Sequence, residues 1–147
     1  QYTLPNGMTI LGIILASDEM HLMNFLGDKS MHAVYMTLGN ISNSMQRKVQ
    51  QYAWMLLTKI PTSKFSKMVF LTKTEADCMP GILWCQLFHH CMQIVFEPMQ
   101  TDWQVIHTAI DPDGNTCQCL AVLMAWIANL KEQYDIVGLA TNLCPRC

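Results

Sequence analysis

A continuous apolar run near the N-terminus limits what this chain can fold into. Residues 10–16, ILGIILA, contain no polar side chain, so an extended segment here is expected to be covered on both faces. The run stops at Ser17, Asp18 and Glu19. A carboxylate at the exit of a buried strand must be hydrated, hydrogen-bonded or neutralised by a cation, because an unpaired buried charge is very unfavourable. Asp18 is therefore the first candidate site residue, although an Asp that only turns the chain out to solvent explains it as well.

Composition indicates one intracellular domain that is unusually apolar. The 147 residues are 51% hydrophobic and 14% charged, so part of the surface is expected to meet a partner or further chain of the same protein. The net charge of −2 lacks the basic footprint of a stand-alone nucleic-acid binder. No segment has the length of a membrane helix, so no membrane partner is expected. Seven scattered cysteines favour a reducing compartment over a secreted disulfide scaffold.

The remaining pattern predicts an α/β domain. Short strands are expected at residues 33–38 and 51–60, and residues 105–109 are short and β-prone. Residues 80–97 have helical periodicity, with Pro80 expected in the first turn and Pro98 expected to end the helix. One face of this helix is apolar and is expected to be buried: Trp84, Phe88, Cys91 and Val95. The opposite face is polar: Gln86, His90, Gln93 and Glu97.

Several motifs follow one another in a specific order. They are SDEMHLMNFLGDKSMHAVYMTLGNIS at 17–42, LFHHCMQIVFEP at 87–98, DPDG at 111–114 and CPRC at 144–147. In this order they resemble the core of the Plavaka transposases, fungal relatives of the CACTA group of cut-and-paste DNA transposons. The resemblance covers nearly the whole chain. It implies that residues 1–147 are a single, partial DDE transposase domain, incomplete at its C-terminus, in a nuclear protein that acts on DNA at transposon ends.

The resemblance also implies a fold, a ribonuclease-H-like mixed sheet with the order strand, strand, strand, helix, strand. The segment LAVLMAWIANL, residues 120–130, would then be a buried strand, although its Leu, Ala and Met content favours a helix. In that fold the run ending at Asp18 and the run ending at Asn129 are parallel neighbours. In the helical alternative, Asn129 would lie away from Asp18.

The implied chemistry is cleavage and strand transfer of DNA by divalent cations, for which Mg²⁺ prefers carboxylate ligands. Asp18 matches the first acidic residue of the family. The second acidic position aligns with Asn129, and the third is expected beyond Cys147. Glu132 and Asp135 lie near Asn129 in the sequence but are poor substitutes for the missing carboxylate. The chain as given is therefore expected not to cut DNA.

A second metal is suggested by the CPRC ending, because Cys144 and Cys147 could supply half of a tetrahedral Zn²⁺ site. The other half would have to come from Cys117 and Cys119 or from residues past the end. The alternatives are two free thiols or a redox-active pair, and the latter needs a helix that starts at the motif. A separate metal role for residues 85–91, CQLFHHC, competes with a plain apolar role for its two cysteines.

Two rival interpretations stay open. A decayed transposase domain can persist as a non-catalytic scaffold that binds protein or docks DNA, and the apolar composition and Asn129 favour this interpretation. The reading frame can also be a genomic relic without selected function.

Overall fold

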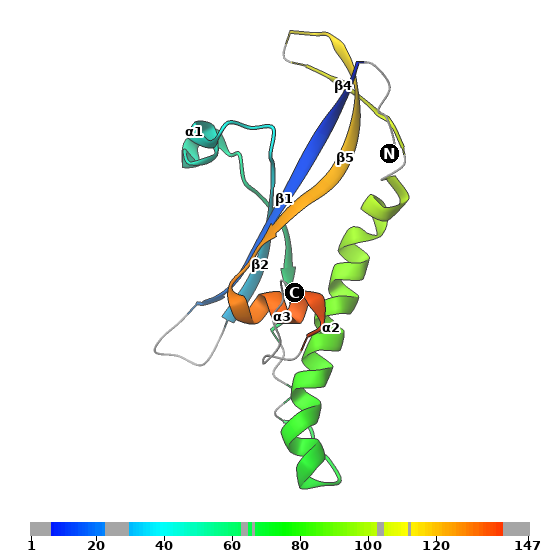
Figure 1. Ribbon diagram of the computed structural model, residues 1–147. Coiled ribbons are helices and arrows are strands. Elements are labelled where there is room, and N and C mark those ends of the chain that lie inside the picture. The colour runs from blue at the N-terminus through cyan, green and yellow to red at the C-terminus, as the bar shows by residue number, and fades with distance from the viewer. Residues whose placement is uncertain are drawn as a thin grey trace.

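The computed structural model describes residues 7–22, 30–62, 65, 67–102, 105–111 and 113–139. They form a mixed α/β structure with a curled five-stranded sheet in the order β3-β2-β1-β5-β4 (Figure 1). The strands are β1 (Met8–His21), β2 (Ser30–Leu38), β3 (Met55–Ile60), β4 (His107–Ile110) and β5 (Thr116–Ile127). The helices are α1 (Asn43–Gln46), the 3₁₀ turn η1 (Val49–Gln51), α2 (Lys73–Asp102) and α3 (Leu130–Val137). No described helix is both long and apolar enough to cross a membrane.

The central strand β1 lies between an antiparallel and a parallel neighbour. It pairs antiparallel with β2 and parallel with β5. The prediction that the run ending at Asp18 and the run ending at Asn129 are parallel neighbours is thus confirmed, and the helical alternative is wrong for residues 120–127. The predicted strand ends early, however, because Asn129 caps α3 and Leu130 is its first residue. The expected strand at residues 105–109 is present as β4, which joins β5 through the turn that contains Asp113.

The first strand is longer than predicted and is covered differently. Pairing with β2 continues through Asp18 opposite Ala33 to His21 opposite Ser30, so Asp18 lies within β1 and not at its exit. The backbone hydrogen bonds of the ladder hold these polar residues in the strand. Leu15 is fully buried, whereas Ile10 is 42% exposed. The expectation that both faces of residues 10–16 are covered is therefore wrong for the described part of the chain.

The third strand is shorter than predicted. It begins at Met55 and not at Gln51, because Val49–Gln51 forms a 3₁₀ turn that ends at Tyr52. Tyr52 has a φ of 49°, in the left-handed region, which a strand cannot contain.

The predicted helix is present but extends beyond both prolines. It starts at Lys73, because Thr72 and Glu75 form reciprocal hydrogen bonds of 3.2 and 3.1 Å between side chain and backbone N–H. Pro80 and Pro98 are consequently inside the helix, where each removes one backbone hydrogen bond. The predicted faces are confirmed: Phe88 is buried, while Gln86, His90 and Gln93 are exposed.

The core lies between the sheet and the two longer helices. In Figure 1, α2 runs beside the sheet, and α3 lies crosswise to α2 where β5 ends. The buried cluster joins β2, β3 and α2 through Val34, Ile60, Phe88 and Met92. Trp126 of β5 and Ile136 of α3 pack against this cluster. One face of the sheet is therefore covered by α2 and α3.

The turn after β2 is tied to β1 by the side chain of Asn40. Its Oδ1 accepts a hydrogen bond of 2.9 Å from the Gly12 N–H, and its Nδ2 donates one of 2.8 Å to the Ile10 carbonyl. The Gly39 N–H also donates to the Gly12 carbonyl at 2.6 Å. The amide of Asn40 thus continues the β2 side of the ladder after the strand has ended.

The backbone at Gly12 is also closely approached from β5. A Cβ on Gly12 would overlap Sδ of Met124, which lies at a register shift between β1 and β5.

Replacement of Asn40 should destabilise the sheet. Asn40→Ala removes a donor and an acceptor, and we expect the free energy of unfolding to fall by about 1–2 kcal/mol in urea denaturation. Asn43→Ala is the matched control, because its Oδ1 accepts a single exposed hydrogen bond from Arg47 at 3.1 Å. This control should lose less than about 0.5 kcal/mol. Equal losses in the two variants would contradict a structural role for Asn40.

Candidate functional site

Asp18 and Asn129 line one pocket at the end of the parallel strand pair. The last register pair of β1 and β5 is Ala16 with Ile127. Asp18 and Asn129 each lie two residues beyond this pair. Both line an open pocket of about 460 Å³ together with Ala16, Ser17, Tyr35, Ile127 and Ala128. The geometry therefore brings together the two residues that the sequence singled out for one site.

Asp18 projects from the sheet face opposite α2. Side chains alternate along a strand, and its neighbour Ser17 is buried on the α2 face, where its Oγ accepts a hydrogen bond of 2.7 Å from Trp126 Nε1. Asp18 itself is exposed. The carboxylate of Asp18 is accessible from the pocket. Among the described residues, Asp18 is the only acidic residue that lines the pocket.

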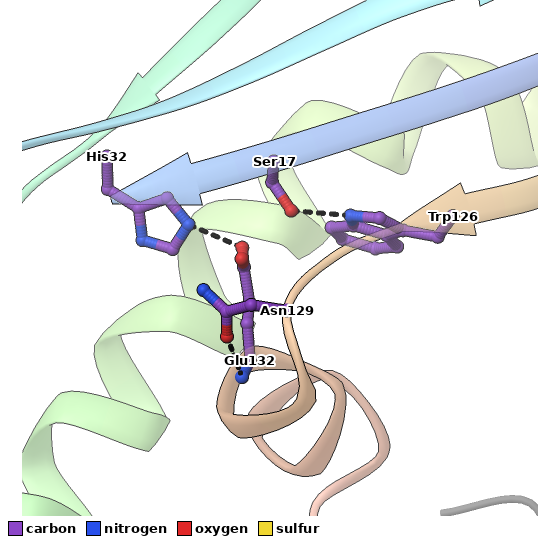
Figure 2. A network of polar contacts seen from close by, with 5 residues as sticks. All are labelled: Ser17, His32, Trp126, Asn129 and Glu132. Atoms are coloured by element: carbon purple, nitrogen blue, oxygen red, sulfur yellow. Dashed lines mark hydrogen bonds and ion pairs between the residues drawn. The ribbon is translucent and has the colours of Figure 1, made fainter. Parts of the chain in front are cut away.

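Asn129 has a clear structural role as the N-cap of α3. Its backbone is extended, with φ −67° and ψ 164°, and its Oδ1 accepts a hydrogen bond of 2.9 Å from the Glu132 N–H (Figure 2). Asn and Asp are about equally good at this position, because either offers an oxygen to the first turn. The amide of Asn129 therefore caps α3 as well as the Asp that the family resemblance led us to expect at this position.

A buried polar pair lies beside the pocket. Nε2 of His32 and Oε1 of Glu132 are 2.6 Å apart, and the side chains are 3% and 4% exposed. The imidazole stacks on Trp84 and Phe88 of α2, with ring centroids 6.3 and 5.8 Å away. Figure 2 shows the pair reaching from β2 to the first turn of α3. Removal of one partner would leave the other buried without its hydrogen bond, a loss of roughly 1–3 kcal/mol for a buried polar group.

Glu132 and Asp135 do not replace the carboxylate absent at Asn129. Glu132 is directed to His32, and Asp135 accepts a hydrogen bond of 3.7 Å from Sγ of Cys85. Burial raises the pKa of Asp135, and the charge of Lys131 partly opposes this. Burial also raises the pKa of the Cys85 thiol, with the charge of Asp135 adding to the shift.

The remaining metal candidates are not gathered into a site. Among the described residues, no three His, Cys, Asp or Glu side chains are close enough to hold a metal ion. Cys117 and Cys119 are neighbours on β5, and Cys119 is buried. Cys144 and Cys147, the candidate zinc ligands, lie outside the described residues. The Zn²⁺ hypothesis therefore has no structural observation behind it.

Sequence analysis did not predict the polar contacts on the helix-covered face. Ser17, His32, Trp126 and Glu132 were not expected to interact. A His within the apolar strand sequence MHAVYM signals a buried polar group that needs a partner. Its partner is 100 residues away, and no local pattern identifies it.

A family model described as Plavaka transposase matches residues 1–147. No curated protein and no solved structure matches the chain.

The pKa shifts at Asp135 and Asp111 predict stability changes of opposite sign. The pKa of Asp135 is above its ordinary value of 3.8, so the folded state binds its proton more tightly and its ionisation lowers stability as the pH rises. The pKa of Asp111 is below 3.8, chiefly because Asn115 donates to it, so its contribution is present at neutral pH and is lost on acidification.

Thermal melts between about pH 3 and pH 7 should resolve the two cases. Asp135→Asn should gain stability relative to the wild type as the pH rises, because Asn cannot ionise. Asp111→Asn should lose stability over the same range. A change of the same sign in both variants would contradict the assigned causes.

Proposed function

The chain belongs to the Plavaka transposase family, and on that premise we propose that it forms part of a DDE transposase core with a ribonuclease-H-like fold. The activity proposed for the family core is Mg²⁺-dependent cleavage and strand transfer of DNA at transposon ends, in the nucleus. The observation that carries the proposal is the shared pocket of Asp18 and Asn129 at the end of two parallel strands. Two divalent cations placed between such residues activate the attacking oxygen and stabilise the leaving oxygen at a phosphate.

We assign Asp18 as the Mg²⁺ ligand of this site. It is exposed and directed into the pocket side of the sheet, and a hard cation prefers such an oxygen. Asn129 supplies no charge, and its Oδ1 already accepts from the Glu132 N–H. Two closely spaced cations depend on negative ligands, so this chain holds a cation weakly and is defective in DNA cleavage.

The metal assignment predicts weak binding of Mn²⁺, used as a paramagnetic probe for Mg²⁺. Titration should broaden the amide NMR signals of residues 17–19, and Asp18→Ala should abolish the effect. Glu19→Ala is the matched control, because Glu19 is the next residue of β1 and alternates to the other face. Broadening that persists in Asp18→Ala, or that is absent from residues 17–19 of the wild type, would contradict the site.

Restoration of the second carboxylate should strengthen the site. Asn129→Asp keeps the helix cap and adds a charge, so Mn²⁺ affinity should rise about tenfold, since ligand charge sets the affinity of oxygen sites. In a protein extended past Cys147 to include the third acidic position, nicking of plasmid DNA should then occur in the Asn129→Asp variant and not in the parent chain. Asn129→Ser, which also caps helices, controls for the loss of the amide.

A non-catalytic scaffold that binds protein or docks DNA is the second candidate. The observation that favours it is the apolar character of the sheet face that carries Asp18. Ile10, Met124 and Ile127 are 42%, 64% and 56% exposed there. If neither the parent chain nor the Asn129→Asp variant supports nicking, the scaffold is the better description.

A further inference from the structure

The His32–Glu132 pair crosses the sheet at the level of the pocket. His32 lies opposite Glu19 in the β1–β2 ladder, and the next pair in that ladder is Ala33 with Asp18. Glu132 is in the first turn of α3, three residues after Asn129. Because β1 separates β2 from β5 in the sheet, the hydrogen bond between the two side chains passes over the end of β1. It does so on the α2 face, behind Asp18.

The same glutamate is bound at both of its ends. Its side chain accepts from His32, and its backbone N–H donates to Asn129 Oδ1 at 2.9 Å. The chain of contacts from β2 to the pocket is therefore His32, Glu132, Asn129 (Figure 2). A shift of α3 relative to β2 must move Asn129 relative to Asp18.

The pair is not optimised for stability alone. Nδ1 of His32 and Oε2 of Glu132 are buried and have no hydrogen-bond partner among the residues that the structure describes. Replacement of such an incompletely satisfied pair by apolar side chains of similar size is often neutral or favourable for stability. A polar pair at this place is better explained by the directional constraint that a short hydrogen bond imposes and an apolar contact does not.

We propose that His32 and Glu132 are positioning residues that hold the first turn of α3, and with it residue 129, at a fixed distance from Asp18. This inference rests on the proposed function, because the feature being positioned is the cation site. The hydrogen bond, and not the charge of Glu132, carries the effect. Neither residue touches the cation.

The first experiment measures Mn²⁺ affinity in the Asn129→Asp background, well below the melting temperature. Glu132→Ala should weaken binding about tenfold, as removal of a residue that orients a ligand does. Glu132→Gln should stay within about twofold, because its Oε1 still accepts from His32. Ile13→Val, at a buried position of β1 six residues before the residue opposite His32, controls for reduced stability and should bind as tightly as the background.

The second experiment does not depend on a cation. Amide hydrogen exchange at residue 132 reports the cap formed by Asn129, and Glu132→Ala in the wild-type chain should lower its protection by about fivefold to tenfold, the effect of losing a cap. Glu132→Gln and Ile13→Val should leave this protection unchanged.

The outcomes separate the two ideas. If Mn²⁺ binds no variant through Asp18, the proposed function fails, and the exchange data still decide the positioning role. If Glu132→Ala only lowers stability, as Ile13→Val does, with unchanged affinity and protection, the pair is structural and the inference is wrong. The inference is also wrong if Glu132→Gln behaves like Glu132→Ala, because the hydrogen bond would then not carry the effect.

Discussion

The parallel pairing of β1 with β5 is the interaction on which the rest of this structure depends. Parallel neighbours cannot be joined by a tight turn, so the chain must leave the sheet after β3 and return to it. α2 spans most of this connection, and it is held on one face because Phe88 and Met92 pack against Val34 and Ile60. Burial of a side chain as large as Phe88 contributes about 2 kcal/mol relative to exposure. The crossover and the sheet therefore stabilise each other, and the ends of β1 and β5 meet as a consequence.

The local sequence pattern predicted the presence of the first strand and of the long helix, but not where these elements end. The helical stripe with Phe88 was readable because burial repeats with the period of the helix. The apolar run at residues 10–16 predicted a strand but not that only one of its faces is covered. The limits of the elements are not readable in this way. β1 continues past Asp18 because β2 supplies a hydrogen-bonding partner. α2 continues past Pro98, although the proline removes one backbone hydrogen bond. Residues 120–127 form a strand, against their helix propensity, because they pair with β1. Family resemblance, and not the local pattern, predicted this strand.

The candidate site was predicted in part for the same reason. Family resemblance singled out Asp18 and Asn129, and both line one pocket because parallel strands bring their ends together. The groups that surround them come from three separate elements, and the pair of His32 with Glu132 joins residues 100 positions apart. Position 129 carries the cap of α3 and, under the proposed function, would also face a cation. Helix capping needs only an oxygen, whereas a cation site needs charge, and the amide supplies the first without the second. Either Asn or Asp at this position therefore preserves the cap of α3.

The contact between Gly12 and Met124 has a consequence for how this sheet can change over time. Met124 occupies the space that a side chain at residue 12 would need, and it also lies against Gly39. The three positions, drawn from β1, the turn after β2 and β5, therefore adjoin one another. Met124 is 64% exposed, so a larger residue at position 12 requires its thioether to turn out toward solvent or residue 124 to become smaller. The side chain at residue 12 is thus coupled to the conformation and size of the side chain at residue 124.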